Sequence, residues 1–215
     1  MNSYWEFLRY SWHPLLSEAL GHVAIVAGAM ALAFVLEACL GIVAYRRPWL
    51  AEPLLSVAST ALTLPSLALF GLMIPIFGLG FLPTFVVLVI YAIMPVLRNL
   101  ITGLNSISPA VVEASVGMGM TRLRRLFKVE IPLAWPVIVA GLRFSSMMIV
   151  GVAAVGAYVG GPGLGSTLFN GLQEVGSPAA VPEVVIATGA ILVLALLIDG
   201  LFWLLARLTV SPGIR

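Results

Sequence analysis

Charged residues are scarce in this sequence. Only 9% of its 215 residues are Asp, Glu, Lys or Arg, whereas an ordinary water-soluble domain carries roughly 25%. Hydrophobic residues make up 61% of the chain, and its mean hydropathy is +1.11. The shortage of charge therefore excludes an ordinary soluble domain and predicts an all-α protein that spans a membrane.

The few charges also nearly cancel, because the sequence contains 11 basic and 9 acidic residues. That balance is too weak to suggest a nucleic-acid partner. Cysteine occurs once, so a disulfide within the chain is excluded, and its place in an apolar run predicts that Cys39 is a buried small side chain.

Sequence patterns for catalysis and metal binding are missing as well. The chain has no Gly-x-x-x-x-Gly-Lys-[Ser/Thr] phosphate loop, so we assign it no ATP hydrolysis and no catalytic residue. His13 and His22 lie far from any Cys or acidic pattern with metal-ligand spacing, which favours structural roles for both and predicts no metal site.

What the sequence does contain is long apolar stretches. A helix needs about 20 apolar residues to cross a bilayer. Five stretches meet this requirement, at about residues 19–45, 53–80, 80–97, 133–158 and 184–206. The first could instead be a signal peptide, but the 18 residues before it are mixed and acidic rather than short and basic, so we expect a retained span.

The basic residues predict the orientation of these spans. Nine of the eleven Lys and Arg residues fall on one side of a five-span topology, and the positive-inside rule makes that side cytoplasmic. The N-terminus is then outside and the C-terminus inside. This gives an extracytoplasmic segment 1–18, a transmembrane domain 19–208 with a cytoplasmic loop 98–132, and a cytoplasmic tail 209–215.

The loop 98–132 is the one substantial polar segment, and a cytoplasmic loop of this length is suited to docking a soluble partner. Ser108-Pro109 predicts the start of a short helix, which Gly117 and Gly119 interrupt. After the glycines, apolar residues at helical spacing alternate with four basic residues, which predicts a second helix lying at the membrane surface.

This loop resembles a known sequence element. Glu113-Ala114-Ser115, three residues, Gly119, nine residues and then Val129-Glu130-Ile131-Pro132 match the spacing of the "EAA" loop of ABC importer permeases. Ser115, Val129 and Ile131 are mild departures from that pattern.

Further segments resemble the osmoprotectant subfamily, which imports glycine betaine, carnitine, choline and similar compounds. His22 also lies where that subfamily carries a histidine, and the likeness covers roughly residues 15–208. The matching segments are Leu64-Pro65-Ser66-Leu67-Ala68-Leu69, Tyr91-Ala92-Ile93-Met94-Pro95-Val96-Leu97-Arg98-Asn99, Gly117-Met118-Gly119-Met120-Thr121, Ile131-Pro132-Leu133-Ala134 and Gly160-Gly161-Pro162-Gly163-Leu164-Gly165.

The resemblance implies a type I ABC importer permease with the MetI-like fold, a multi-pass protein of the bacterial inner membrane. It implies two ATPase subunits, a second permease that is identical or paralogous, and an extracytoplasmic substrate-binding protein; ATP and Mg would be bound by the ATPases and no cofactor by this chain. The residues placed at the ATPase-coupling loop are Glu113, Ala114, Ser115, Gly117, Met118, Gly119, Thr121, Ile131 and Pro132. A helical linker that contacts only lipid headgroups is the other interpretation, mainly for the basic helix after residue 121.

A cluster of glycines follows the fourth span, on the predicted outer side. We interpret Gly160, Gly161, Gly163 and Gly165 as an external gate loop or a close subunit contact, because a plain turn needs fewer glycines.

Three ionisable residues lie within the spans, toward their predicted cytoplasmic ends. Such groups usually face protein or water, so we expect Arg143 to pair with Glu37 or Asp199. Snorkelling of Arg143 toward the membrane surface is the alternative.

Two other functions remain as alternatives to osmoprotectant import. An ABC permease could carry another small solute, such as an amino acid or a betaine-like thiol compound. An ion-coupled secondary transporter would need duplicated halves and ionisable residues near the midplane, neither of which the sequence shows, and a structural anchor does not require the spaced loop motif.

Overall fold

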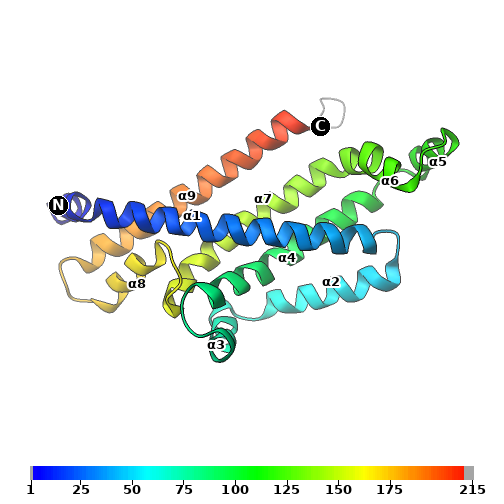
Figure 1. The fold of residues 1–215 in the computed structure, drawn as a ribbon. Coiled ribbons are helices and arrows are strands. Elements are labelled where there is room, and N and C mark those ends of the chain that lie inside the picture. The colour runs from blue at the N-terminus through cyan, green and yellow to red at the C-terminus, as the bar shows by residue number, and fades with distance from the viewer. Residues whose placement is uncertain (1, 211–215) are drawn as a thin grey trace.

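The computed structural model describes residues 2–210, and every regular element within that range is helical (Figure 1). Four described helices are long and apolar enough to cross a bilayer, and a bent pair of shorter helices that meets the same criterion together is the fifth candidate span. The long elements are α1 (Asn2–Ala44), α4 (Phe81–Asn105), α7 (Ile131–Gly156) and α9 (Ala180–Thr209), and the bent pair is α2 (Pro48–Thr63) and α3 (Ser66–Phe77). The expected all-α architecture is confirmed.

The core lies where α1, α4 and α7 pack along one another (Figure 1). Its fully buried side chains are small or branched, which permits close helix contact in an environment where lipid is as apolar as the core itself. They include Ala29, Ala33, Val87, Leu88, Ala92, Ile149 and Ala153. In contrast, α9 is mostly exposed along its length and packs mainly on α7 and α8 (Gly165–Gln173).

Helix α1 is longer than the sequence predicted. Residues 2–18, expected as a separate segment, continue the same helix through Pro14. Its 43 residues reach about 65 Å, more than twice the roughly 30 Å of bilayer hydrocarbon, so its first turns extend beyond a membrane-spanning length.

The side of α1 that packs inward also corrects the expectation for Cys39. Ala33, Glu37 and Gly41 recur at four-residue spacing and are buried, so they form the inward face of the helix. Cys39 lies between these positions and is exposed on the other side.

The second crossing breaks at Leu64, which the division near residue 80 did not anticipate. Leu64 is extended (ψ 133°), as expected before a proline, and α3 restarts after Pro65 at an angle of 100° to α2. The Tyr91 hydroxyl donates to the Leu64 carbonyl that the break leaves without a helical partner. The other break, between α3 and α4, lies at Gly78–Gly80 as expected.

The polar loop 98–132 is more helical than expected. Helix α4 continues to Asn105, so Arg98 lies within it, and the short helix α5 covers Pro109–Gly117. The basic segment forms α6 (Arg122–Arg125) and a π-helical turn, η1 (Leu126–Glu130), which run directly into α7. Because no residue interrupts this helix, the basic segment is not a separate helix lying on the membrane surface.

The two candidate functional segments of the sequence lie at opposite ends of the molecule (Figure 1). Helices α5 and α6 lie at one end, and the start of α1 lies at the other, near α8. The end of α9 joins the start of α7, since the Trp135 indole donates to the Thr209 hydroxyl over 2.7 Å. Of the tail 209–215, residues 211–215 lie outside the described residues.

Candidate functional site

Helix α5 begins and ends at the residues that the loop pattern indicated. Pro109 occupies its first turn, although the Ser108 side chain makes no capping hydrogen bond. The helix closes through Gly119, whose φ of +75° suits glycine, and the Met120 N–H bonds back to the Ser115 carbonyl over 3.1 Å.

The two faces of α5 differ in exposure. Val112 and Ser115 are buried against the rest of the chain, and the Ser115 hydroxyl donates to the Val111 carbonyl over 2.7 Å. Glu113, Ala114, Gly117 and Gly119 are exposed, and Met118 retains 68% of its surface. The outward face of α5 is therefore a short, largely uncharged surface with one carboxylate. Of the residues placed at the coupling loop, Ser115 alone turns fully inward.

The other coupling residues belong to the helix that follows. Thr121 caps α6, since its hydroxyl accepts from the Arg124 N–H over 3.4 Å. Ile131 and Pro132 lie where η1 passes directly into α7. Because proline has no N–H, one backbone carbonyl of the preceding turn loses its helical donor there. Leu123 of α6 and Phe127 of η1 are exposed as well, so accessible apolar side chains are not confined to α5.

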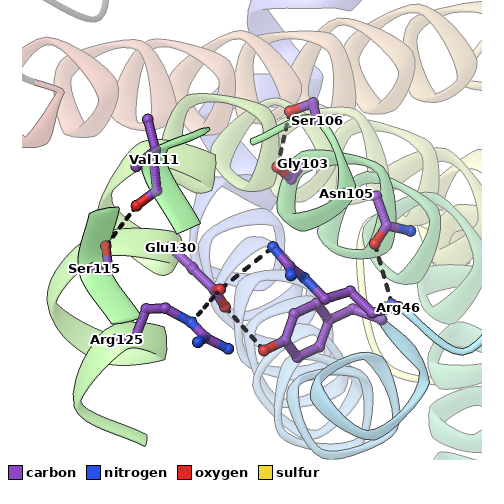
Figure 2. A network of polar contacts seen from close by, with 9 residues as sticks. Arg46, Gly103, Asn105, Ser106, Val111, Ser115, Arg125 and Glu130 are labelled. Atoms are coloured by element: carbon purple, nitrogen blue, oxygen red, sulfur yellow. Dashed lines mark hydrogen bonds and ion pairs between the residues drawn. The ribbon is translucent and has the colours of Figure 1, made fainter. Parts of the chain in front are cut away.

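A buried carboxylate holds this region together (Figure 2). Glu130 is fully buried and accepts hydrogen bonds from the Tyr45 hydroxyl and from Arg125 Nε, each over 2.9 Å. Arg46 Nη2 lies 3.5 Å from the same carboxylate, and the Arg46 backbone N–H donates to the Asn105 side-chain oxygen over 3.1 Å.

The partners of Glu130 come from separate parts of the chain. Tyr45 and Arg46 follow α1, and Arg125 lies in the helix that runs into α7. Asn105, which ends α4, bonds to Arg46 and not to Glu130. A buried carboxylate with two guanidinium groups and a hydroxyl is well satisfied, and loss of the carboxylate itself would leave the largely buried Arg125 without its counter-ion. The network therefore joins the end of α1 to the helical segment Arg122–Glu130 that leads into α7, and the Arg46 backbone contact adds the end of α4.

The glycine segment at the opposite end is tightly packed. Gly160 and Gly163 have positive φ values of +81° and +132°, and a Cβ on Gly163 would lie 2.7 Å from His22 Nδ1. A Cβ on Gly165 would lie 2.0 Å from the Ala154 carbonyl oxygen. A Cβ on Gly161 would lie 2.2 Å from the Thr84 hydroxyl of α4. Contacts within the chain thus account for these glycines, and the external gate stays a prediction.

His22 has the structural role that its sequence context favoured. Its ring is fully buried, and Nε2 lies 3.1 Å from the Val150 carbonyl oxygen, which joins α1 to α7. Together with Gly163, this contact fixes the glycine segment against α1.

The ionisable residues of the spans do not form one cluster. Arg143 and Asp199 make a bidentate ion pair between α7 and α9, in which Nη2 lies 2.7 Å from Oδ2 and Nε contacts Oδ1. Glu37 is fully buried on α1, and neither of its carboxyl oxygens has a hydrogen-bond partner among the described residues. The pair therefore involves Asp199 and not Glu37.

Comparison with protein families identifies the family to which this chain belongs. Residues 20–210 match the family described as binding-protein-dependent transport system inner membrane component. The chain belongs to this family. It is accordingly a transmembrane permease subunit of an ABC importer, located in the inner membrane.

Relatives of this permease cover nearly its whole length. The osmoprotectant import permease protein OsmW of Salmonella typhimurium is 41% identical over 209 residues, which are 94% of each chain. The carnitine transport permease protein OpuCB of Listeria monocytogenes is 36% identical over 80% of this chain and 79% of its own. The choline transport system permease protein OpuBB of Bacillus subtilis is 33% identical over 98% of this chain and 95% of its own.

A solved structure shares the fold. A chain of the MetNI methionine ABC transporter, solved in inward-facing conformations, superposes with a TM-score of 0.80 and covers 92% of the permease and 96% of its own length. The sequences are 23% identical, so this likeness supports the type I importer fold and no more.

Sequence reasoning missed most of the Glu130 network of the permease. Glu130 stood within the quoted loop motif but was not assigned a contact, and Tyr45 and Arg46 were noted only as the end of a span. A carboxylate between two apolar residues at a helix start is a signal for a buried acid, although its partners lie up to 85 residues away.

Proposed function

We propose that the chain is the permease of an importer for small quaternary ammonium osmoprotectants such as glycine betaine, carnitine and choline. The observation that carries this is the agreement among relatives, because those that match most of the chain at 32–41% identity bear names from this one solute class. Another small solute, such as an amino acid or a betaine-like thiol compound, is the second candidate, since the methionine transporter shares the fold.

The proposal includes an orientation. The end of the molecule with α5 and α6 faces the cytoplasm, and the start of α1 faces outward. The basic residues support this, because Arg122, Arg124 and Lys128 belong to α6 and η1, and the turn with Arg46 and Arg47 meets the same region through the Arg46–Glu130 contact. The C-terminus then lies inside.

The exposed face of α5 is proposed to dock on the ATPase subunit. Two such subunits bind ATP and Mg and close on each other, and a second permease and an extracytoplasmic binding protein complete the importer. Glu113 offers a carboxylate for pairing at the docked surface, while Ala114, Gly117 and Gly119 allow close backbone approach. Glu130 bonds Tyr45 at the end of α1 and Arg125 of α6, so a displacement of α5 that carries α6 with it would act on α1 and α7.

The test is solute uptake by the assembled importer in proteoliposomes, with ATP enclosed and the binding protein outside. We expect uptake of labelled glycine betaine, carnitine or choline that requires ATP and the ATPase subunit, and no uptake of methionine. Binding assays on the binding protein identify the solute independently. Uptake that persists without the ATPase but collapses with an ion gradient would show a secondary transporter instead.

A further inference from the structure

Arg143 lies near the middle of α7, and Asp199 lies about two thirds of the way along α9. Arg143 is about 18 Å from the start of α7, and Asp199 is about 15 Å from the end of α9. The side chains are nevertheless 44% and 22% exposed on the surface of this chain. Snorkelling is not needed, because each charge has its counter-ion.

Because this ion pair is exposed far from the ends of its helices, its surroundings in the membrane must be polar or must consist of protein. Charged side chains in membrane-spanning helices face protein or a water-filled path, because contact with lipid is unfavourable by several kcal/mol. The bidentate contact engages Nε and Nη2 of Arg143, which leaves the two N–H groups of Nη1 outside the pair. The exposed side of the pair therefore retains hydrogen-bond donors of its own.

The pair lines a cavity of about 460 Å³ between α7 and α9. Three aromatic side chains, Phe144, Phe202 and Trp203, line the same cavity. Its size lies within the range of small-molecule sites, which combine apolar and aromatic walls with a few polar groups.

These groups match the chemistry of a quaternary ammonium zwitterion. A trimethylammonium group has no N–H to donate and is recognised by aromatic faces and by a nearby negative charge. A carboxylate is recognised by guanidinium N–H groups in charge-assisted hydrogen bonds. Asp199 with Phe144 and Phe202 supplies the first set, since the Trp203 ring already carries the Arg207 guanidinium 5.3 Å from its centroid. Nη1 of Arg143 supplies the second set within the same cavity.

We propose that this cavity is a solute-binding subsite on the translocation path, in which Asp199 and the aromatic rings hold the ammonium group and Arg143 holds the carboxylate. The inference rests on the proposed function, since it names residues that would contact the solute. It assigns different roles to the two charges: Arg143 discriminates glycine betaine and carnitine, which carry a carboxylate, from choline, which does not.

The test compares uptake of glycine betaine and choline by the assembled importer carrying Arg143→Gln. The measured quantity is the ratio of the two uptake rates, so that a general loss of transport cancels. We expect the ratio to fall about tenfold or more, which corresponds to one lost charge-assisted hydrogen bond. Arg143→Lys keeps the positive charge and should return the ratio toward that of the wild type.

Basal ATP hydrolysis and assembly are measured on the same preparations, and Arg9→Gln, at the other end of the molecule, is the matched control. If Arg143→Gln does not assemble, the Arg143→Gln/Asp199→Asn double variant, which keeps a neutral hydrogen-bonding pair, replaces it. A ratio within about twofold of the wild-type value overturns the subsite and makes the pair a structural or subunit contact. A wild-type importer that takes up neither solute refutes the proposed function, which is a separate outcome.

Discussion

Replacement of Glu130 tests whether the buried network holds the coupling region to the membrane helices. Glu130→Gln keeps the shape of the side chain but removes the charge that faces Arg125 and Arg46. Arg125 is 13% exposed and Arg46 is 39% exposed, so the Arg125 contact stabilises the fold more, while solvent partly screens the Arg46 contact.

The expected change in the free energy of unfolding follows from these contacts. A hydrogen bond to a charged group contributes about 1.5–3 kcal/mol, whereas a neutral one contributes about 1 kcal/mol. Glu130→Gln, which keeps the geometry and loses the charge, should therefore lower the free energy of unfolding by about 1–3 kcal/mol. Glu130→Ala also leaves Arg125 without its partner, and its expected loss is about 3–5 kcal/mol.

The assay is unfolding of the purified permease by SDS in mixed micelles, followed by tryptophan fluorescence. Tyr45→Phe removes one hydroxyl donor and should lie between the wild type and Glu130→Gln. Glu113→Gln is the matched control, because Glu113 is an exposed carboxylate on α5, and it should change stability by less than about 0.5 kcal/mol. Equal stability of the Glu130 and Glu113 variants would refute the reasoning.

Three further predictions use the same purified protein and importer. Gly165→Ala should abolish monodisperse protein in gel filtration because its Cβ would meet the Ala154 carbonyl at 2.0 Å, whereas Gly151→Ala, which has open space around it, should behave as wild type. Reversal of Arg143 or of Asp199 alone should reduce ATP-dependent uptake, and exchange of the two charges should restore part of it; failure of the exchange would argue against a structural pair. Gly119→Ala, at a φ of +75°, should weaken ATPase co-purification by straining the turn after α5, and unchanged co-purification would place the docking surface elsewhere.

Local patterns predicted most of the helical architecture. Apolar runs located the spans, and Gly78–Gly80 and Ser108-Pro109 marked boundaries where the backbone does break. The break at Leu64 was equally visible in Leu64-Pro65, but a continuous apolar run concealed it because hydropathy does not register a missing N–H.

Contacts between distant residues could be predicted only in part. Arg143 had two candidate acids, and the choice of Asp199 depends on how α9 packs on α7. Cys39 and Glu37 occupy the same apolar run, and only the rotation of α1 decides that the acid faces inward and the thiol outward. The Glu130 network depends on three helix ends meeting at one point, which no local spacing specifies.

The uninterrupted helix from Arg122 to Val159 has a consequence for how far a movement travels. Its 38 residues extend about 57 Å, with Arg143 about 32 Å from one end and about 24 Å from the other. A tilt of about 10° around the Arg143–Asp199 contact displaces the two ends by roughly 5 Å and 4 Å in opposite directions. Since Gly160 follows directly after Val159, a rigid tilt of this helix would carry the glycine segment in the direction opposite to the basic end. The π-helical turn and the prolines Pro132 and Pro136 are the points at which bending would reduce that displacement.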